Sequence, residues 1–169
     1  MTRTRWAVLG PGVISGDFAT GLRSSHLGVL HAVGSSAPER AAAFAAEHGA
    51  AASGTYDEIL AREDVDAVYI GTVHTTHSAL AIRALEAGKA VLCEKPITPT
   101  AAETDLVLAA AARSGRPFVE AFKQRFQLNE HSEEGLAENN VHRFHHAMVN
   151  QITGELPGVE RVAERLLVD

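Results

Sequence analysis

The first two-thirds of the chain alternates short apolar runs with stretches of helical spacing. The apolar runs, which predict strands, are 6–9, 29–33, 66–70, 90–93 and 117–121. The stretches between them predict helices at 12–22, 38–48, 56–61, 78–87 and 100–114. Strands that alternate with helices indicate parallel pairing, and continuously apolar strands indicate a sheet covered on both faces. The pattern therefore predicts an α/β fold built on a doubly wound parallel sheet.

Helical spacing and punctuation support the predicted helices. In the first of them one side carries Val13, Ile14, Phe18 and Leu22, which we expect to form its buried face. The second helix begins at Pro38 and is followed by Gly49. Proline in the first turn and glycine just past the end are typical helix boundaries.

The pattern changes near Lys123, where we predict a boundary between an α/β domain (1–123) and a short helical tail (124–169). The tail is polar, rich in His and Glu, and has no run typical of a strand. One helical stripe in it is formed by Val141, Phe144, Met148 and Ile152. So short a helix cannot bury its apolar side alone. We therefore expect it to pack on the α/β domain or on a second copy, which predicts a homo-oligomer.

Composition and charge exclude several classes of protein. Of 169 residues, 46% are hydrophobic, and the formal net charge is −6, which argues against a nucleic-acid-binding face. No run approaches the ~20 apolar residues of a membrane span, and the N-terminus lacks the pattern of a signal peptide. The single cysteine, Cys93, excludes an internal disulfide framework and predicts a buried strand residue rather than a nucleophile. These features predict a soluble, cytoplasmic protein.

A glycine turn joins the first predicted strand to the first helix. The segment Gly10-Pro11-Gly12-Val13-Ile14-Ser15 has the spacing G-x-G-x-x-small. In a Rossmann domain this turn brings the pyrophosphate of a dinucleotide onto free N–H groups at the helix start. An ordinary strand–helix turn is the alternative, and the position of the segment favours dinucleotide binding.

The end of the second strand bears on the choice of cofactor. An acidic residue there would bind a ribose 2′-hydroxyl and disfavour a 2′-phosphate. This chain instead has Ser35 and Ser36, with Arg40 one turn into the next helix. The pattern favours NADP over NAD, although the two serines are also typical of a simple turn and helix cap.

A lysine follows the strand at 90–93, in the segment Cys93-Glu94-Lys95-Pro96. The carboxyl end of a strand in an open α/β sheet faces the ligand crevice. A partly desolvated Lys95 there could orient a substrate hydroxyl or exchange a proton with it. The alternative is a surface lysine paired with a nearby acid.

Three segments together resemble the NAD(P)-dependent glucose–fructose oxidoreductase/inositol dehydrogenase (Gfo/Idh/MocA) family. Residues 79–96 end in the family's E-K-P, and 71–77 look like its T-P-x-x-x-H segment with Val73 in place of proline. The sequence Glu120-Ala121-Phe122, followed by Arg125-Phe126, is similar to the dihydrodiol-dehydrogenase-like branch. With the glycine turn, the resemblance covers about residues 4–126.

The resemblance implies a role for each matching position in hydride transfer between a nicotinamide and a sugar, polyol or related hydroxy or keto compound. The pyrophosphate would contact Gly10, Gly12, Val13 and Ile14. The adenosine end would contact Ser35, Ser36 and Arg40. The nicotinamide half would contact Thr72, His77, Glu94 and Lys95. The resemblance makes Lys95 the catalytic lysine, with possible help from His77.

The tail changes the picture of activity. Members of the family are much longer and carry a second α/β domain that covers the nicotinamide, and no comparable run of strands follows Lys123. The second hypothesis is therefore a dinucleotide-binding module without turnover. In the tail, His142 and His146 are four residues apart, but no Glu stands where H-E-x-x-H chemistry requires it, so we predict no metal site.

Overall fold

The computed structural model describes residues 3–121. It therefore covers nearly all of the predicted α/β domain. The predictions made for the tail lie outside the described residues: its apolar helical stripe, His142 and His146, and the boundary near Lys123.

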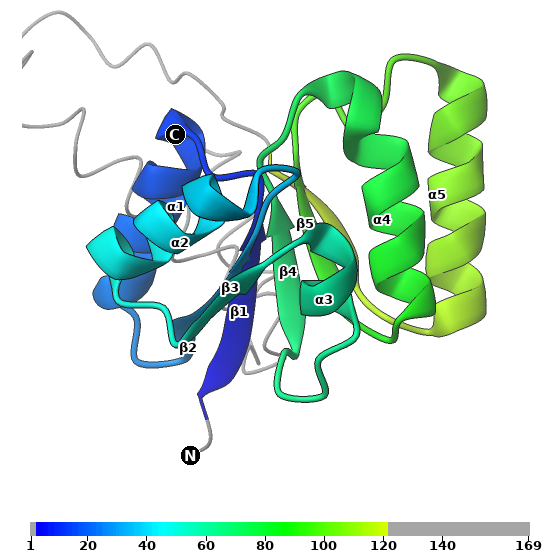
Figure 1. Ribbon diagram of the computed structural model, residues 1–169. Coiled ribbons are helices and arrows are strands. Elements are labelled where there is room, and N and C mark those ends of the chain that lie inside the picture. The colour runs from blue at the N-terminus through cyan, green and yellow to red at the C-terminus, as the bar shows by residue number, and fades with distance from the viewer. Residues whose placement is uncertain (1–2, 122–169) are drawn as a thin grey trace, which may run out of the picture.

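The described residues form strands and helices in alternation (Figure 1). The strands are β1 (Thr4–Leu9), β2 (Gly28–Gly34), β3 (Ala52–Gly54), β4 (Ala67–Ile70), β5 (Ala90–Glu94) and β6 (Phe118–Ala121). The helices are α1 (Val13–Arg23), α2 (Pro38–His48), α3 (Tyr56–Leu60), α4 (His77–Glu86) and α5 (Ala101–Ser114), with a 3-10 turn η1 (His74–Thr76) before α4.

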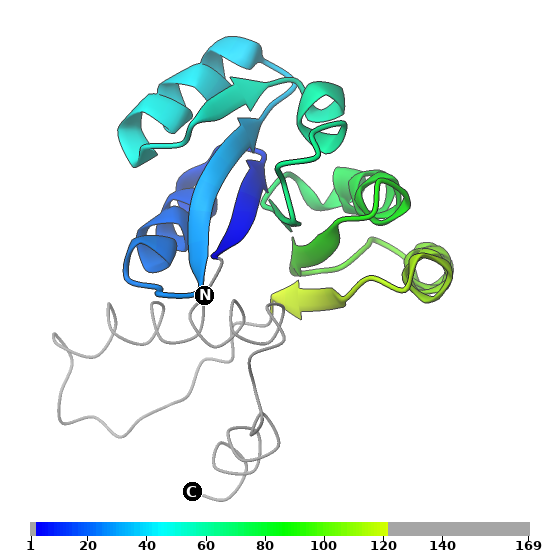
Figure 2. The same cartoon turned by 90° about the horizontal axis from the view of Figure 1, so that it is seen from below.

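All six strands are parallel and form one sheet in the order β3-β2-β1-β4-β5-β6. The first strand lies at the centre, where Leu9 pairs with Gly34 on one side and with Ile70 on the other. The chain therefore runs outward from β1 to one edge, returns, and runs outward to the other edge (Figure 2). This is the doubly wound order that the alternation of strands and helices predicted.

Helices cover both faces of the sheet because successive strand residues point to opposite sides. Trp6 and Val8 pack with Phe18 and Leu22 of α1 on one face, whereas Ala7 and Leu9 belong to the core on the other face, under α3 and α4. Figure 1 shows α1 and α2 on one side of the sheet and α4 and α5 on the other. Burial on both faces explains why the strands read as continuous apolar runs.

Helix ends follow local sequence signals. The side chain of Thr55 accepts a hydrogen bond from the backbone of Glu58, whose carboxylate accepts one from Thr55 N–H, which begins α3 with a capping box. Two longer helices, α2 and α5, end at Gly49 and Gly115, both with left-handed backbone angles that favour glycine.

The structure differs from the sequence expectations in three places. The strand β3 (Ala52–Gly54) was not predicted, because it has only three residues at a sheet edge and no apolar run. Helix α4 begins at His77, one residue earlier than predicted, and η1 precedes it. Val13 was expected on the buried face of α1 but is 90% exposed, because it occupies the first helical position, beyond the end of the sheet.

Candidate functional site

The predicted site residues follow four different strands. Gly10 follows β1, Ser35 follows β2, Thr72 follows β4, and Lys95 follows β5. Because these strands are parallel, their carboxyl ends meet at one edge of the sheet. That edge is where ligands of open α/β sheets bind.

The glycine turn is pressed against the loop after β4. Gly10 has a φ of +90°, and a Cβ at this position would lie 2.5 Å from Cγ2 of Thr72 and 3.0 Å from its backbone. The hydroxyl of Ser15 donates a hydrogen bond to the Gly10 carbonyl at 2.7 Å and fixes the turn from beneath. Only glycine fits both the angle and the space at Gly10.

The start of α1 is bare. Gly12 is its N-cap residue, no side chain caps the helix, and a Cβ at Gly12 would meet no atom within 4 Å. The first intrahelical bond runs from Gly16 N–H to the Gly12 carbonyl at 3.0 Å. The earlier N–H groups of a helix have no partner within it, and they attract anions. The open turn therefore fits a pyrophosphate.

The end of β2 contacts the same turn through Arg40. Its guanidinium donates to the carbonyl of Pro11 at 3.0 Å. Ser35 is 2% exposed and its hydroxyl accepts a hydrogen bond from Ala37 N–H at 3.2 Å, so Ser35 shapes the turn before α2. Ser36 is exposed. Of the three residues expected at the adenosine end, Ser36 and Arg40 are accessible, and Ser35 is committed to the turn.

The loop after β4 is held by hydroxyl and imidazole groups. The hydroxyl of Thr76 lies 2.7 Å from Oγ1 of Thr72 and 2.8 Å from the carbonyl of Val73, which are alternative acceptors for its one hydrogen. The ring of His77 lies 3.0 Å through Nε2 from the Thr72 carbonyl and 2.8 Å through Nδ1 from the Pro96 carbonyl. His77 is 1% exposed, so its ring faces these two carbonyls rather than solvent. The geometry favours a positioning role over direct catalysis.

A buried tyrosine orients the carboxylate next to the predicted catalytic lysine. Tyr69 Oη donates to Oε1 of Glu94 at 2.7 Å, and the backbone N–H of Lys95 lies 3.3 Å from Oε2 of the same group. Burial, followed by the nearby charge of Glu94, raises the pKa of Tyr69 far above its ordinary value, so it remains a donor. The ring of Tyr69 stacks on Phe18 with centroids 4.1 Å apart.

Lys95 itself is exposed, and no ion pair joins it to an acid among residues 3–121. Neither of its sequence interpretations is met there, since the side chain is not desolvated and not paired. The backbone bond to Glu94 fixes where the side chain starts. Cys93, by contrast, is fully buried in β5, and burial raises the pKa of its thiol to about 12, which confirms it as a buried strand residue.

The predicted residues form one chain of contacts along the edge. It runs from Arg40 to the glycine turn, from that turn to Thr72, and from Thr72 through His77 to the loop of Lys95. Sequence reasoning missed Tyr69 and Thr76, which act through hydrogen bonds that no spacing reveals. It also missed Gly71, where a Cβ would lie 2.3 Å from Oγ of Ser15.

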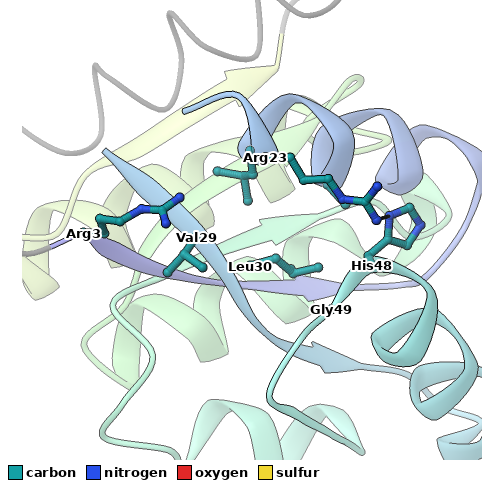
Figure 3. Close-up of a pocket in the computed structure, with 8 residues that line it drawn as sticks. Arg3, Arg23, Val29, Leu30, His48 and Gly49 are labelled. Atoms are coloured by element: carbon teal, nitrogen blue, oxygen red, sulfur yellow. Dashed lines mark hydrogen bonds between the residues drawn. The ribbon is translucent and has the colours of Figure 1, made fainter. Parts of the chain in front are cut away.

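A hollow lies away from this edge, between α1, the start of β2 and the end of α2 (Figure 3). Its volume is about 220 Å³. The guanidinium of Arg23 donates to the Glu47 carbonyl at 3.0 Å and lies 3.4 Å from Nδ1 of His48, while Arg3 donates to the carbonyls of Ser25 and Gly28. These basic groups join chain segments, which is a structural role.

Neither a metal cluster nor a membrane helix occurs in the part of the chain that the structure describes. Residues 3–121 bring no three His, Cys, Asp or Glu side chains together in a group that could hold a metal ion. None of the helices in that range is long and apolar enough to cross a membrane.

Comparison with known protein families matches residues 4–122 to an oxidoreductase family described as having an NAD-binding Rossmann fold, Gfo/Idh/MocA. The chain belongs to this family. The match begins with β1 and ends one residue after β6, so it coincides with the described sheet.

Relatives within the family include dihydrodiol dehydrogenases. The trans-1,2-dihydrobenzene-1,2-diol dehydrogenase of Bos taurus is 43% identical over 127 residues, which are 72% of this chain and 37% of that protein. The Homo sapiens enzyme of the same name is 40% identical over the same shares of each chain. The chain thus spans little more than a third of the length of these curated relatives.

Solved structures show the same fold. A 3-ketoreductase from Actinomadura kijaniata, KijD10, solved in complex with NADP, has a TM-score of 0.69 and 32% identity, covering 72% of this chain and 39% of its own. An NAD-binding oxidoreductase from Klebsiella pneumoniae has a TM-score of 0.69 and 26% identity, covering 71% of this chain and 34% of its own. The family's NAD(P)-binding domain is therefore the part of these proteins that this chain shares.

Proposed function

We propose that this chain binds NADP through the carboxyl edge of its sheet and serves NADP-dependent oxidoreduction of a sugar, polyol or related hydroxy or keto compound. The observation that carries the proposal is the bare start of α1, with open space at Gly12 and no side-chain cap. Such a turn offers N–H groups to a pyrophosphate without competition from the protein's own side chains.

The remaining site residues fit the rest of a dinucleotide. Gly12, Val13 and Ile14 would hold the pyrophosphate, with Gly10 shaping the turn beneath it. Thr72, Glu94 and Lys95 would flank the nicotinamide half. When bound, the cofactor supplies hydride transfer, and the protein supplies position and charge. The exposed ammonium of Lys95 would hold or move a proton at the substrate oxygen.

The preference for NADP rests on the residues that follow β2. No carboxylate stands at the end of this strand, whereas Ser36 is exposed and Arg40 brings a guanidinium to the glycine turn. A guanidinium binds a phosphate through paired, charge-assisted hydrogen bonds. The complex of KijD10 with NADP supports the same preference.

Turnover by this chain is a separate question from binding. Catalysis needs substrate positioning and exclusion of water, and the chain spans about 37% of its dehydrogenase relatives. A binding module without turnover is therefore the second candidate function, favoured by the exposure to solvent of Lys95 and Pro96.

Calorimetric titration of the full chain with NADPH and then NADH tests the proposal. We expect NADPH to bind more tightly, and Arg40→Ala to weaken NADPH about tenfold while leaving NADH little changed, because a charge-assisted phosphate contact is lost. Failure of both cofactors to bind would refute the proposal. Lys95→Ala then separates the two candidates. If Lys95 is catalytic, its loss abolishes turnover of sugars or diols while NADPH affinity is retained.

Cellular location and assembly belong to the same proposal. A cytoplasmic location suits a chain whose single thiol, Cys93, is buried and reduced. We also propose a homo-oligomer, because the apolar helical stripe that the sequence predicts in the tail needs a surface to pack on, which a second copy would supply. Light scattering across a wide concentration range tests this, and a monomer throughout would contradict it.

A further inference from the structure

One imidazole joins the two loops that flank the inferred nicotinamide half of the site. His77 begins α4, in the second half of the sheet, and its ring is almost fully buried. Through Nε2 it contacts the carbonyl of Thr72, in the loop after β4. Through Nδ1 it contacts the carbonyl of Pro96, which immediately follows Lys95 in the loop after β5.

Both ring nitrogens face backbone carbonyls. A backbone carbonyl oxygen only accepts hydrogen bonds, and a neutral imidazole has a single N–H. A hydrogen on Nε2 is therefore donated to the Thr72 carbonyl at 3.0 Å, and a hydrogen on Nδ1 to the Pro96 carbonyl at 2.8 Å. Because the ring is 1% exposed and both nitrogens face carbonyls, His77 is placed to join two loops rather than to take a proton from a substrate.

The joining of these two loops bears on the position of Lys95. β4 pairs with β5 from Ala67 opposite Ala90 to Ile70 opposite Cys93, so the sheet fixes the starts of the two loops but not their far ends. The Thr72 loop lies close against the glycine turn, since a Cβ at Gly10 would come within 2.5 Å of Cγ2 of Thr72. A ring that ties Pro96 to Thr72 therefore sets the distance between the glycine turn and Lys95.

We propose that His77 is a positioning residue, which pins the Thr72 loop to the Lys95–Pro96 loop and so sets the width of the site for the nicotinamide ring. The inference rests on the proposed function, since it assigns a task within the same site. It predicts that His77 matters for the nicotinamide end of the cofactor and not for the adenosine end, which Ser36 and Arg40 serve.

Substitutions at His77 combined with two ligands test this. The ligands are NADPH and 2′-phospho-ADP-ribose, which is the same molecule without the nicotinamide ring. His77→Phe keeps the ring shape and removes both ring nitrogens, so we expect NADPH affinity to fall about tenfold with 2′-phospho-ADP-ribose affinity unchanged. His48→Phe is the matched control, because His48 is a partly buried ring at the end of α2, in the other half of the molecule.

Two conservative variants separate the contact of His77 with Pro96 from its contact with Thr72. His77→Asn retains a donor near Nδ1, toward Pro96, and His77→Gln retains one near Nε2, toward Thr72. Each is expected to recover part of the NADPH affinity lost in His77→Phe, and neither is expected to reach the wild-type value. These variants also carry the test if His77→Phe does not fold.

The outcomes are distinguishable. If the wild-type chain binds neither ligand, the proposed function fails. If it binds both ligands and the His77 variants bind both as well as the wild type does, the positioning role is refuted. An equal loss of both ligands also refutes it, because that result would show a general structural role with no selectivity for the nicotinamide end.

Discussion

The two halves of the sheet approach the same edge in different ways. The first half, from β1 to β3, presents mostly backbone there: Gly10, Gly12 and the first turn of α1, with Val13 exposed. The second half, from β4 to β6, presents side chains held by other elements. His77 lies between two carbonyls, and Glu94 accepts a hydrogen bond from Tyr69.

Under the proposed function, the difference matches what each half would recognise. A pyrophosphate is the same in every dinucleotide and is bound well by N–H groups and close backbone approach, for which glycine suffices. A reacting ring and its substrate need side chains held within narrow limits, so each such side chain needs a partner of its own. Backbone recognition in one half and anchored side chains in the other therefore fit a division into binding and chemistry.

The largest effect is expected where the two halves touch. In Gly71→Ala the new Cβ would lie 2.3 Å from Oγ of Ser15 and 2.9 Å from Cε1 of Tyr69, so α1 and β4 must separate. We expect a loss of about 3 kcal/mol in the free energy of unfolding, measured with urea. Gly12→Ala is the control, because its Cβ meets no atom within 4 Å and its cost is expected to stay below about 1 kcal/mol. Equal costs would remove the distinction between a packed and an open glycine.

A smaller effect is expected from the anchor of Glu94. Tyr69→Phe keeps the ring on Phe18 but removes the hydroxyl that donates to Oε1 of the buried carboxylate. Losing a hydrogen bond to a charged group costs about 2 kcal/mol in unfolding free energy. Tyr56→Phe removes the other tyrosine hydroxyl of the chain as a control. A Tyr69→Phe variant as stable as the wild type would show that Glu94 needs no anchor.

The smallest effect concerns an exposed link between the halves. Asp64, in the loop before β4, accepts hydrogen bonds from Arg62 at 2.6 and 2.7 Å and lies 2.9 Å from Nε2 of His31 on β2. These bonds hold the pKa of Asp64 well below its ordinary value of 3.8. A carboxyl group whose pKa is lowered on folding stabilises the folded state at pH values above its ordinary pKa. That stability is lost as the pH falls below the ordinary pKa toward the lowered one.

Urea unfolding at pH 6 and pH 3 measures this contribution. The wild-type chain is expected to lose more stability between the two values than Asp64→Asn does, since the variant has no carboxylate to protonate there. Asp105→Asn, on the exposed side of α5, serves as the control. The same pH dependence in Asp64→Asn and the wild type would show that the contacts of Asp64 do not contribute to the free energy of unfolding.

The fold was largely predictable from the sequence because buried strands and helices need apolar residues at regular positions along the chain. Strands covered on both faces require apolar residues throughout, and five of the six strands were found as such runs. The exception, β3, is a short edge strand with one exposed and two half-buried residues, so its sequence contains no apolar run. The glycine turn was recognisable for a related reason, since only glycine fits the backbone angle and the space at Gly10.

The hydrogen bonds of the site were much less predictable. His77 was expected to line the cofactor site and to assist catalysis, yet its ring contacts the carbonyls of Thr72 and Pro96. Every residue has a carbonyl, so no sequence pattern marks these two as acceptors. The same holds for Arg40 and the Pro11 carbonyl. Sequence indicates which residues gather at the edge, and the backbone path decides what each one touches.

The central place of β1 has a consequence for the order in which the chain is made. β1 is synthesised first, but its second neighbour, β4, ends at Ile70. A nascent chain that has reached only β3 would have β1 as an unpaired edge, with Ala7 and Leu9 lacking their cover from α4. Unpaired apolar edges invite association with other chains. During translation, therefore, this edge of β1 is open to such association until β4 has been made.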